Sequence, residues 1–370
     1  MNKFTVLVFF VCLFGHYFSA SGQKRRNEFF VSATLTGFND HTKFYLVDLD
    51  STQRIDSAYL SNNKVTFKGK IDQPSVFRLY PELEDLYFNL WIEPRTINLA
   101  GSKDKFSRIT VKGSPINDVY DSVQGKHYAL DQLRDSLTTK AVNEPDESKA
   151  IAIWKNIAVV DSKVKSIRVQ TIATFQPSIV TIKELYFLRN DFTRDSLKML
   201  FSRFPSALQN TKYGNIINEY ITTDDLRKGS NFIDIVGKDF NNKEIKLSQY
   251  KNKVIILDFW ASWCGPCRSS NKYLAELHQK YNKEGFEIVS FSLDTNVESW
   301  RTASQKDSVT WVNISDLKGL YSKQAASYKI RAIPRSYLID REGRITEVFT
   351  GYDKAHKERL SSQIEELLRK

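Results

Sequence analysis

The sequence has no apolar run close to the roughly 18 residues that a membrane-spanning helix needs, which excludes an integral membrane protein. It is not poor in apolar residues, because 41% are hydrophobic and 13% aromatic, and this excludes a wholly disordered chain. At 370 residues the chain is too long for one typical domain and has room for two or three. Its net charge of +11 is scattered along the sequence, a pattern that indicates solubility and predicts no nucleic-acid partner.

Cysteine is scarce, and one of the three cysteines lies in a segment that looks like a secretory signal. Lys3 gives a positive start, Phe4 to Phe14 is apolar, and the small residues Ala20-Ser21-Gly22 suit a signal peptidase. A lipid-anchor cysteine would close the apolar stretch behind a small residue, whereas Cys12 lies inside it. We therefore predict that residues 1–22 are a cleaved signal peptide and that the protein is exported.

The two remaining cysteines, Cys264 and Cys267, are separated by two residues. A disulfide across so short a loop adds little stability, because the stabilisation grows with loop length. A zinc site would need four ligands, and the sequence has no second Cys-x-x-Cys and no His-x-x-x-His pattern to complete one. An exported protein whose cysteines are confined to one such pair keeps it for chemistry rather than for structure.

Two zones follow the signal and carry no catalytic spacing. Residues 23–113 show short alternating apolar runs between turn residues, which predicts an antiparallel β-sandwich or small barrel. The aromatic-rich run around Trp91 either packs in its core or lines a binding face. Residues 114–228 have apolar residues at helical spacing, which predicts a helical region that ends in a linker near residues 224–230.

Residues 229–370 alternate between strand and helix patterns, which predicts an α/β sheet. The expected strand Val254 to Leu257 leads through a turn to a helix at Cys264, so the Cys264 sulfur lies at the positive end of a helix. A thiolate is stabilised there, and Cys264 becomes both a nucleophile and a good leaving group. Cys267 lies one helical turn deeper. Arg268 is expected to point along the helix surface into solvent, where screening limits its effect on the thiol.

The stretch Asp258 to Cys267, DFWASWCGPC, resembles the active site of thioredoxin, and the resemblance extends over the α/β zone. In that family a cis-proline loop faces the cysteine pair, and Ile333-Pro334 looks like this loop. Asp258 matches a buried carboxylate that moves the proton of the inner cysteine, although on its own it could be a strand-end residue in contact with solvent. The resemblance assigns the client-binding surface to Trp263, Gly265, Pro266, Ile333 and Pro334, with Trp263 either rim or core.

The fit is closer to the exported TlpA/ResA branch of that family. Asp234 to Tyr250 looks like the extra N-terminal hairpin of the branch, and Val297 to Ser315 looks like its inserted helix and strand. The whole chain resembles multi-part thioredoxin-like proteins exported by Bacteroidetes-type bacteria. One feature departs from thioredoxin, which pairs its buried aspartate with a lysine on the next strand, because Ile288 to Leu293 contains no lysine.

The resemblance implies a thiol-disulfide oxidoreductase in the periplasm or cell envelope of a Gram-negative bacterium. Cys264 would attack a protein disulfide and Cys267 would resolve the adduct, with no cofactor and no metal beyond the cysteine pair. The implied partners are disulfide-bearing clients, among them apocytochrome c, and a membrane electron donor of the DsbD or CcdA type. Two alternatives stay open: a peroxiredoxin-like peroxidase, and a cell-envelope binding module in residues 29–228 with an accessory redox domain.

Overall fold

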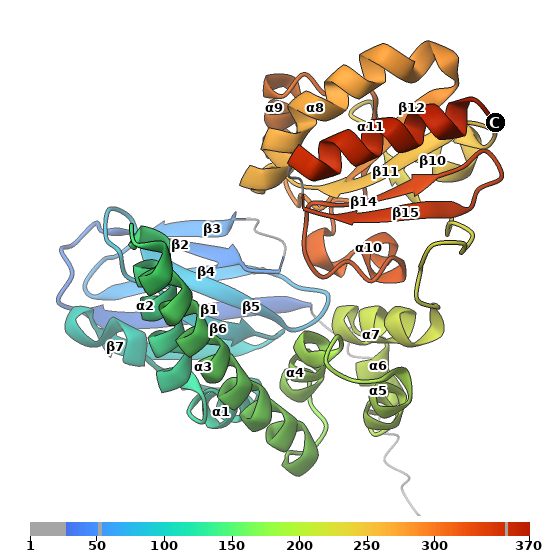
Figure 1. Ribbon diagram of the computed structural model, residues 1–370. Helices are drawn as coiled ribbons and strands as arrows, with labels where there is room; N and C mark the ends of the chain where they lie inside the picture. Colours follow the sequence, from blue (N-terminus) through green and yellow to red (C-terminus); the bar gives the residue numbers. More distant parts are fainter. Residues whose placement is uncertain (1–26, 51–53, 352–353) are drawn as a thin grey trace, which may run out of the picture.

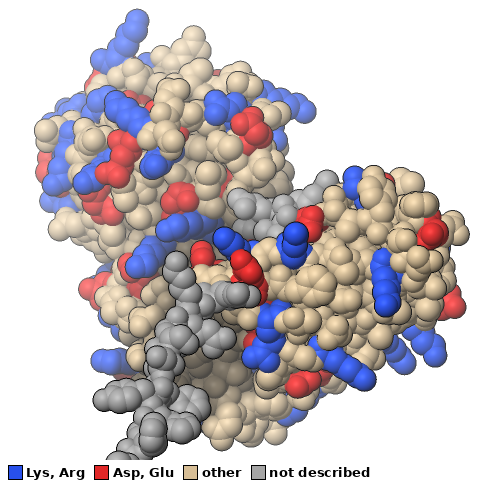
Figure 2. Space-filling model, turned by 180° about the vertical axis from the view of Figure 1, so that it is seen from behind, with Lys and Arg blue, Asp and Glu red and all other residues tan. Residues whose placement is uncertain are grey.

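The computed structural model describes residues 27–50, 54–351 and 354–370 (Figure 1). The predicted signal peptide, residues 1–22, lies outside this part of the chain. A β-sandwich, a helical region and an α/β domain follow one another. On the face of the molecule shown in Figure 2, Lys and Arg side chains are interspersed with those of Asp and Glu.

The N-terminal zone is a sandwich of two four-stranded sheets whose inward side chains form one core. The first sheet has the order β4 (Lys64–Lys70), β1 (Glu28–Thr36), β7 (Thr96–Ser102), β8 (Thr110–Lys112). The second has the order β3 (Arg54–Tyr59), β2 (Lys43–Asp48), β5 (Ser75–Pro81), β6 (Phe88–Ile92). The strands alternate between buried and exposed residues, most clearly in β1, as a half-buried sheet requires.

One strand pair differs from the antiparallel arrangement that we predicted. β1 and β7 run parallel, whereas the other neighbouring pairs of the two sheets are antiparallel. The chain builds the whole second sheet between these two strands, so β7 returns beside β1 in the same direction. A parallel pair needs such a long connection, and the alternation of residues within a strand carries no information on direction.

Seven helices make up the helical region: α1 (Pro115–Gln124), α2 (Tyr128–Asn143), α3 (Glu147–Thr174), α4 (Ile179–Leu188), α5 (Arg194–Phe201), α6 (Ser206–Gln209) and α7 (Lys212–Thr222). Ser114, Asp146 and Ser178 begin α1, α3 and α4 as N-caps, each accepting a backbone N–H bond. Trp91 of β6 is fully buried against side chains of this region, so it is a core residue and no binding face.

The α/β domain has one seven-stranded sheet in the order β10-β9-β13-β12-β11-β14-β15. Its strands are β9 (Val236–Lys238), β10 (Glu244–Lys246), β11 (Val254–Trp260), β12 (Phe286–Ser292), β13 (Val312–Ser315), β14 (Arg335–Ile339) and β15 (Ile345–Thr350). Its helices are α8 (Gly265–Tyr281), α9 (Val297–Lys306), α10 (Lys323–Ser327) and α11 (Lys354–Leu368). Helices α8 and α11 cover one face of the sheet, and α9 and α10 cover the other (Figure 1).

The elements expected of the TlpA/ResA branch are present. β9 and β10 form the hairpin within Asp234 to Tyr250, and α9 with β13 forms the insertion. Residues Lys318 to Tyr328 look like one helix in the sequence, but the structure interrupts the helix in the middle of this stretch. A 3-10 turn over Gly319–Tyr321 ends at Ser322, whose backbone is extended and whose side chain then caps α10.

The three parts of the chain share a buried core. Val76 and Trp91 of the sandwich pack in one cluster with α4 and α7 and with Ala326 of α10. At its edge, the buried Asp50 carboxylate accepts hydrogen bonds from Tyr213 of α7 and from Tyr321 of the α/β domain, both at 2.7 Å. The α/β domain is therefore packed onto the rest of the chain and is more than a tethered unit.

Candidate functional site

The cysteine pair lies where a fully buried strand turns into a helix. Every residue of β11 is buried, and α8 begins at Gly265, so Cys264 is the N-cap of that helix. Cys264 and Cys267 form a disulfide, with 5% and 1% of their surface exposed. The Cys267 backbone N–H donates to Cys264 Sγ at 3.2 Å, which is a contact that stabilises negative charge on this sulfur once the disulfide is reduced.

An exposed rim surrounds the nearly buried Cys264. Trp263 is 62% exposed, which excludes packing in the core, and Gly265 and Pro266 are also exposed. A Cβ atom on Gly265 would meet no atom within 4 Å, so the space over the first turn of α8 is open. Pro266 lies in that first turn, where its missing N–H leaves no helical hydrogen bond unmade.

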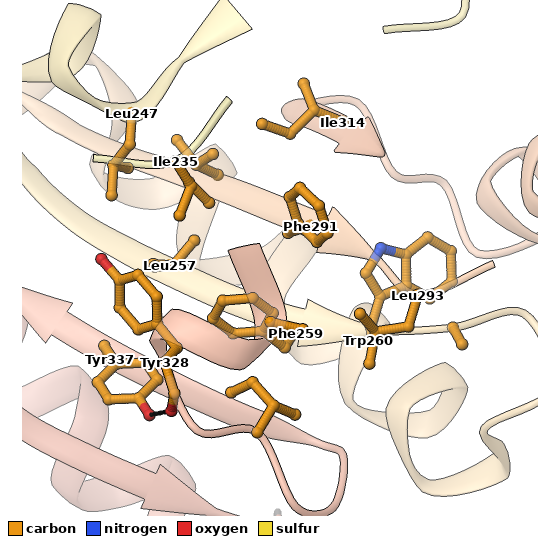
Figure 3. Packing of buried hydrophobic residues seen from close by; sticks show 14 of the residues in the cluster. Ile235, Leu247, Leu257, Phe259, Trp260, Phe291, Leu293, Ile314, Tyr328 and Tyr337 are labelled. Atoms are coloured by element: carbon orange, nitrogen blue, oxygen red, sulfur yellow. Dashed lines mark hydrogen bonds between the residues drawn. The ribbon is translucent and has the colours of Figure 1, made fainter. Parts of the chain in front are cut away.

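The Ile333–Pro334 peptide bond is cis, in the loop directly before β14. Ile333 packs against the same buried cluster to which both cysteines belong. The same cluster includes Phe259, Tyr328 and Tyr337, whose rings pack against one another (Figure 3).

Asp258 is a buried acid on the side of the sheet that α8 covers. It shares its face of β11 with Val254 and Ile256, which pack against that helix, and it is 1% exposed. Burial raises its pKa to about 7, while a hydrogen bond from Ser290 acts in the opposite direction. Asp258 Oδ1 has no hydrogen-bond partner among the residues that the structure describes. The carboxyl group therefore gains and loses a proton near neutral pH, and a solvent-exposed strand-end position is excluded.

The partner of Asp258 on the next strand is Ser290, and β12 contains no lysine. Ser290 lies opposite Asp258 on β12, and its hydroxyl accepts from Trp311 Nε1 at 2.8 Å. A neutral donor opposes the desolvation of a carboxylate less than a cation does, which accounts for the high pKa of Asp258.

The turn that carries Cys264 is held by two buried carboxylates. Asp294, which follows β12, accepts from the Ser262 N–H at 2.9 Å and from the Ser262 hydroxyl at 2.5 Å. Arg268 Nη1 donates to the Ser262 carbonyl at 3.2 Å. The guanidinium also binds the carboxylate of Asp307, the C-cap of α9, through Nε and Nη2, the latter at 2.7 Å.

The expected solvent orientation of Arg268 is thus wrong, because Asp307 draws its side chain onto α9. Sequence reasoning also missed Asp294, Asp307 and Ser290. A signal for Asp294 existed, since it follows a buried strand that neighbours β11 and so belongs to the same carboxyl edge of the sheet.

The arrangement suits a dithiol-disulfide cycle: a shielded sulfur at a helix start, a second sulfur one turn deeper, and an acid that titrates near neutrality. Within the described ranges, no three His, Cys, Asp or Glu residues are grouped so that they could hold a metal ion. No helix in that same part of the chain is both long enough and apolar enough to cross a membrane.

Comparisons with known proteins divide the chain in a similar way. The family profile named Redoxin matches residues 227–368, and a domain of unknown function, DUF4369, matches residues 29–120. The chain is 31% identical over 143 residues to the thiol-disulfide oxidoreductase ResA of a Bacillus cereus strain, covering 38% of this chain and 79% of that protein. It is 29% identical over 149 residues to ResA of Geobacillus thermodenitrificans, covering 40% and 80% respectively.

Among solved structures, a thiol-disulfide oxidoreductase from Bacteroides fragilis NCTC 9343 is 28% identical. The match covers 36% of this chain and 99% of that one, with a TM-score of 0.34.

Proposed function

The chain belongs to the ResA-type thiol-disulfide oxidoreductases, and we propose that it reduces protein disulfides outside the cytoplasm through Cys264 and Cys267. The observation that carries this proposal is the Cys264–Cys267 disulfide at the start of α8, which follows the strand that holds the buried Asp258. Export is supported by the signal-like composition of residues 1–22.

In the first step the Cys264 thiolate attacks one sulfur of the client disulfide. A Cys264–client disulfide forms, and the other client sulfur leaves as a thiolate that takes up a proton from solvent. The N–H groups at the start of α8 stabilise the attacking thiolate, and the open rim of Trp263, Gly265 and Pro266 admits the client chain.

In the second step the Cys267 thiol gives its proton to the Asp258 carboxylate and attacks Cys264 Sγ. The Cys264–Cys267 disulfide forms, and the second client sulfur leaves as a thiolate. Two electrons pass from the cysteine pair to the client, and the pair itself is the only redox group in this scheme. The loop of Ile333 and Pro334 would hold the client backbone next to Cys264.

The enzyme leaves each cycle oxidised, so an outside reductant must restore the dithiol. A membrane donor of the DsbD or CcdA type suits a location in the periplasm or cell envelope, and disulfide-bonded apocytochrome c is one candidate client.

Insulin reduction by the full mature chain, together with its redox potential, tests the proposal. We expect turnover with dithiothreitol as donor, and a potential near the thioredoxin value of roughly −270 mV rather than the DsbA value of roughly −120 mV. Equilibration against glutathione, followed by the fluorescence of the buried Trp260 and the exposed Trp263, measures the potential. Absence of turnover, or a potential above about −150 mV, would contradict a reductase.

A further inference from the structure

Asp294 carries a negative charge that forms no ion pair with a Lys or Arg among the residues that the structure describes. Besides the two bonds from Ser262, its carboxylate accepts from the Ser292 hydroxyl at 2.7 Å, and all three donors are neutral. The side chain is only 2% exposed, so water screens this charge poorly. The carboxylate is hydrogen-bonded to the backbone N–H of Ser262, two residues before Cys264.

Arg268 offsets this charge only in part, because its strongest interactions are with Asp307 and its attraction to Asp294 is the weaker one. The guanidinium forms two hydrogen bonds with the Asp307 carboxylate, which is 7% exposed and accepts a further bond from Asn271 at 2.9 Å. Two buried carboxylates and one guanidinium therefore hold the active-site turn, and together they carry a net charge of −1.

Other charged groups belong to the elements that carry the site. Asp258 lies on β11, the strand that leads into the cysteine turn, and is partly ionised at neutral pH, since its pKa is about 7. Arg331 and Arg335 flank the loop of Ile333 and Pro334 and bind the hydroxyls of Tyr220, Tyr337 and Thr350. These groups keep their charges when a carboxylate of the turn is neutralised, so a change in the ionisation of Cys264 reports on the turn itself.

We propose that Asp294 and Asp307 are positioning residues that fix the turn before Cys264 and, through their charge, restrain ionisation of the Cys264 thiol. This inference rests on the proposed function and deepens it. A thiol that ionises less readily stabilises the dithiol form less, which places the pair at the reducing end of its fold. The net negative charge of Asp294, Asp307 and Arg268 thus offsets part of the stabilisation that the start of α8 gives the thiolate.

Neutralising Asp294 tests the charge while it keeps the shape of the side chain. In the reduced full chain, Asp294→Asn should raise the thiolate fraction of Cys264 at pH 6 by on the order of threefold to tenfold. The readout is the rate of alkylation of Cys264 by iodoacetamide from pH 5 to 9, with each cysteine quantified by mass spectrometry. Asp307→Asn, which frees the charge of Arg268, should shift the profile in the same direction and serves if Asp294→Asn does not fold.

Two controls separate charge from geometry. Asp234 accepts from the Ser248 N–H at 2.9 Å and hydroxyl at 2.7 Å, the same pair of bonds outside the cysteine turn, so Asp234→Asn should leave the profile unchanged. Ser262→Ala removes one bond to Asp294 but no charge, so it should shift the profile much less than Asp294→Asn.

An unchanged or raised Cys264 pKa in both carboxylate variants would overturn the inference, as would an equal shift in Ser262→Ala. Because alkylation measures the thiol itself, this result is independent of whether the protein reduces insulin. Failure of the inference and failure of the proposed function can therefore be distinguished.

Discussion

Asp258→Asn is expected to make the fold more stable while it slows the resolving step. Folding carries the carboxyl group from an ordinary pKa of 3.8 to one of about 7, because burial disfavours its charged form. A shift of about three units corresponds to roughly 4 kcal/mol of destabilisation once the group is ionised. The group is fully buried, so no reduction for solvent screening applies.

The sign of the effect follows from the direction of that shift. Below about pH 4 the carboxyl is protonated in both the folded and the unfolded chain and adds no penalty. Between pH 4 and 7 the unfolded chain ionises first, so the folded state loses stability as the pH rises, and above pH 7 the loss is complete. Asparagine carries no charge, although its amide also needs partners, so roughly 4 kcal/mol is an upper value for the gain.

Urea denaturation of the oxidised wild type and of oxidised Asp258→Asn, at pH 5 and at pH 8, measures this difference. We expect the free energy of unfolding of the variant to exceed that of the wild type by more at pH 8 than at pH 5. An equal difference at the two pH values would refute the assignment of a raised pKa to Asp258.

The kinetic consequence has the opposite sign. A buried acceptor that is half ionised near pH 7 serves the deprotonation of Cys267, so single-turnover resolution of a mixed disulfide should be on the order of 10²-fold slower in the variant. The initial attack by Cys264 should change less. In the wild type the resolution rate should rise between pH 6 and 8. A resolution rate in Asp258→Asn equal to that of the wild type across this range would return Asp258 to a structural role.

Two predictions concern stability elsewhere. Asp50→Asn should cost on the order of 3–5 kcal/mol in urea unfolding, because the half-buried Lys183 and Lys212 lose their common partner. These lysines hold the pKa of Asp50 well below its usual range, so its contribution should be complete above about pH 5 and should decline progressively as the pH falls below about 4. Asp224→Asn, on an exposed ion pair, should change the stability little. Phe259→Ala should cost about 3–5 kcal/mol, because the buried ring packs on Tyr328 and Phe291, and a loss below about 1 kcal/mol would contradict this packing.

Much of the α/β domain could be predicted because its signals are local. The continuous apolar strand before the cysteines, the hairpin within Asp234 to Tyr250 and the helix at Val297 each show their pattern within a few residues. The parallel pairing of β1 with β7 could not be predicted, because it depends on how the whole second sheet is placed between them. Lys318 to Tyr328 does not form one continuous helix, because Ser322 has an extended backbone and caps the new helix α10.

The candidate site divides in the same way. Cys264, Cys267 and Asp258 lie in one contiguous motif, so the sequence shows them together. Asp294 and Asp307 reach the active-site turn only after β12 and α9 have packed beside it. The orientation of Arg268 follows from that packing, because a buried carboxylate attracts a guanidinium more strongly than water does.

The central claim is that Cys264 attacks the client and Cys267 resolves the adduct. Its most direct test is the mass of the adduct formed when each single-cysteine variant, in its reduced form, meets a disulfide-bonded client peptide. Because Cys264 lies at the open rim and Cys267 is 1% exposed, Cys267→Ser should accumulate a mixed disulfide through Cys264, while Cys264→Ser should form none. Equal adduct yields from the two variants would contradict the assignment of the attacking thiol.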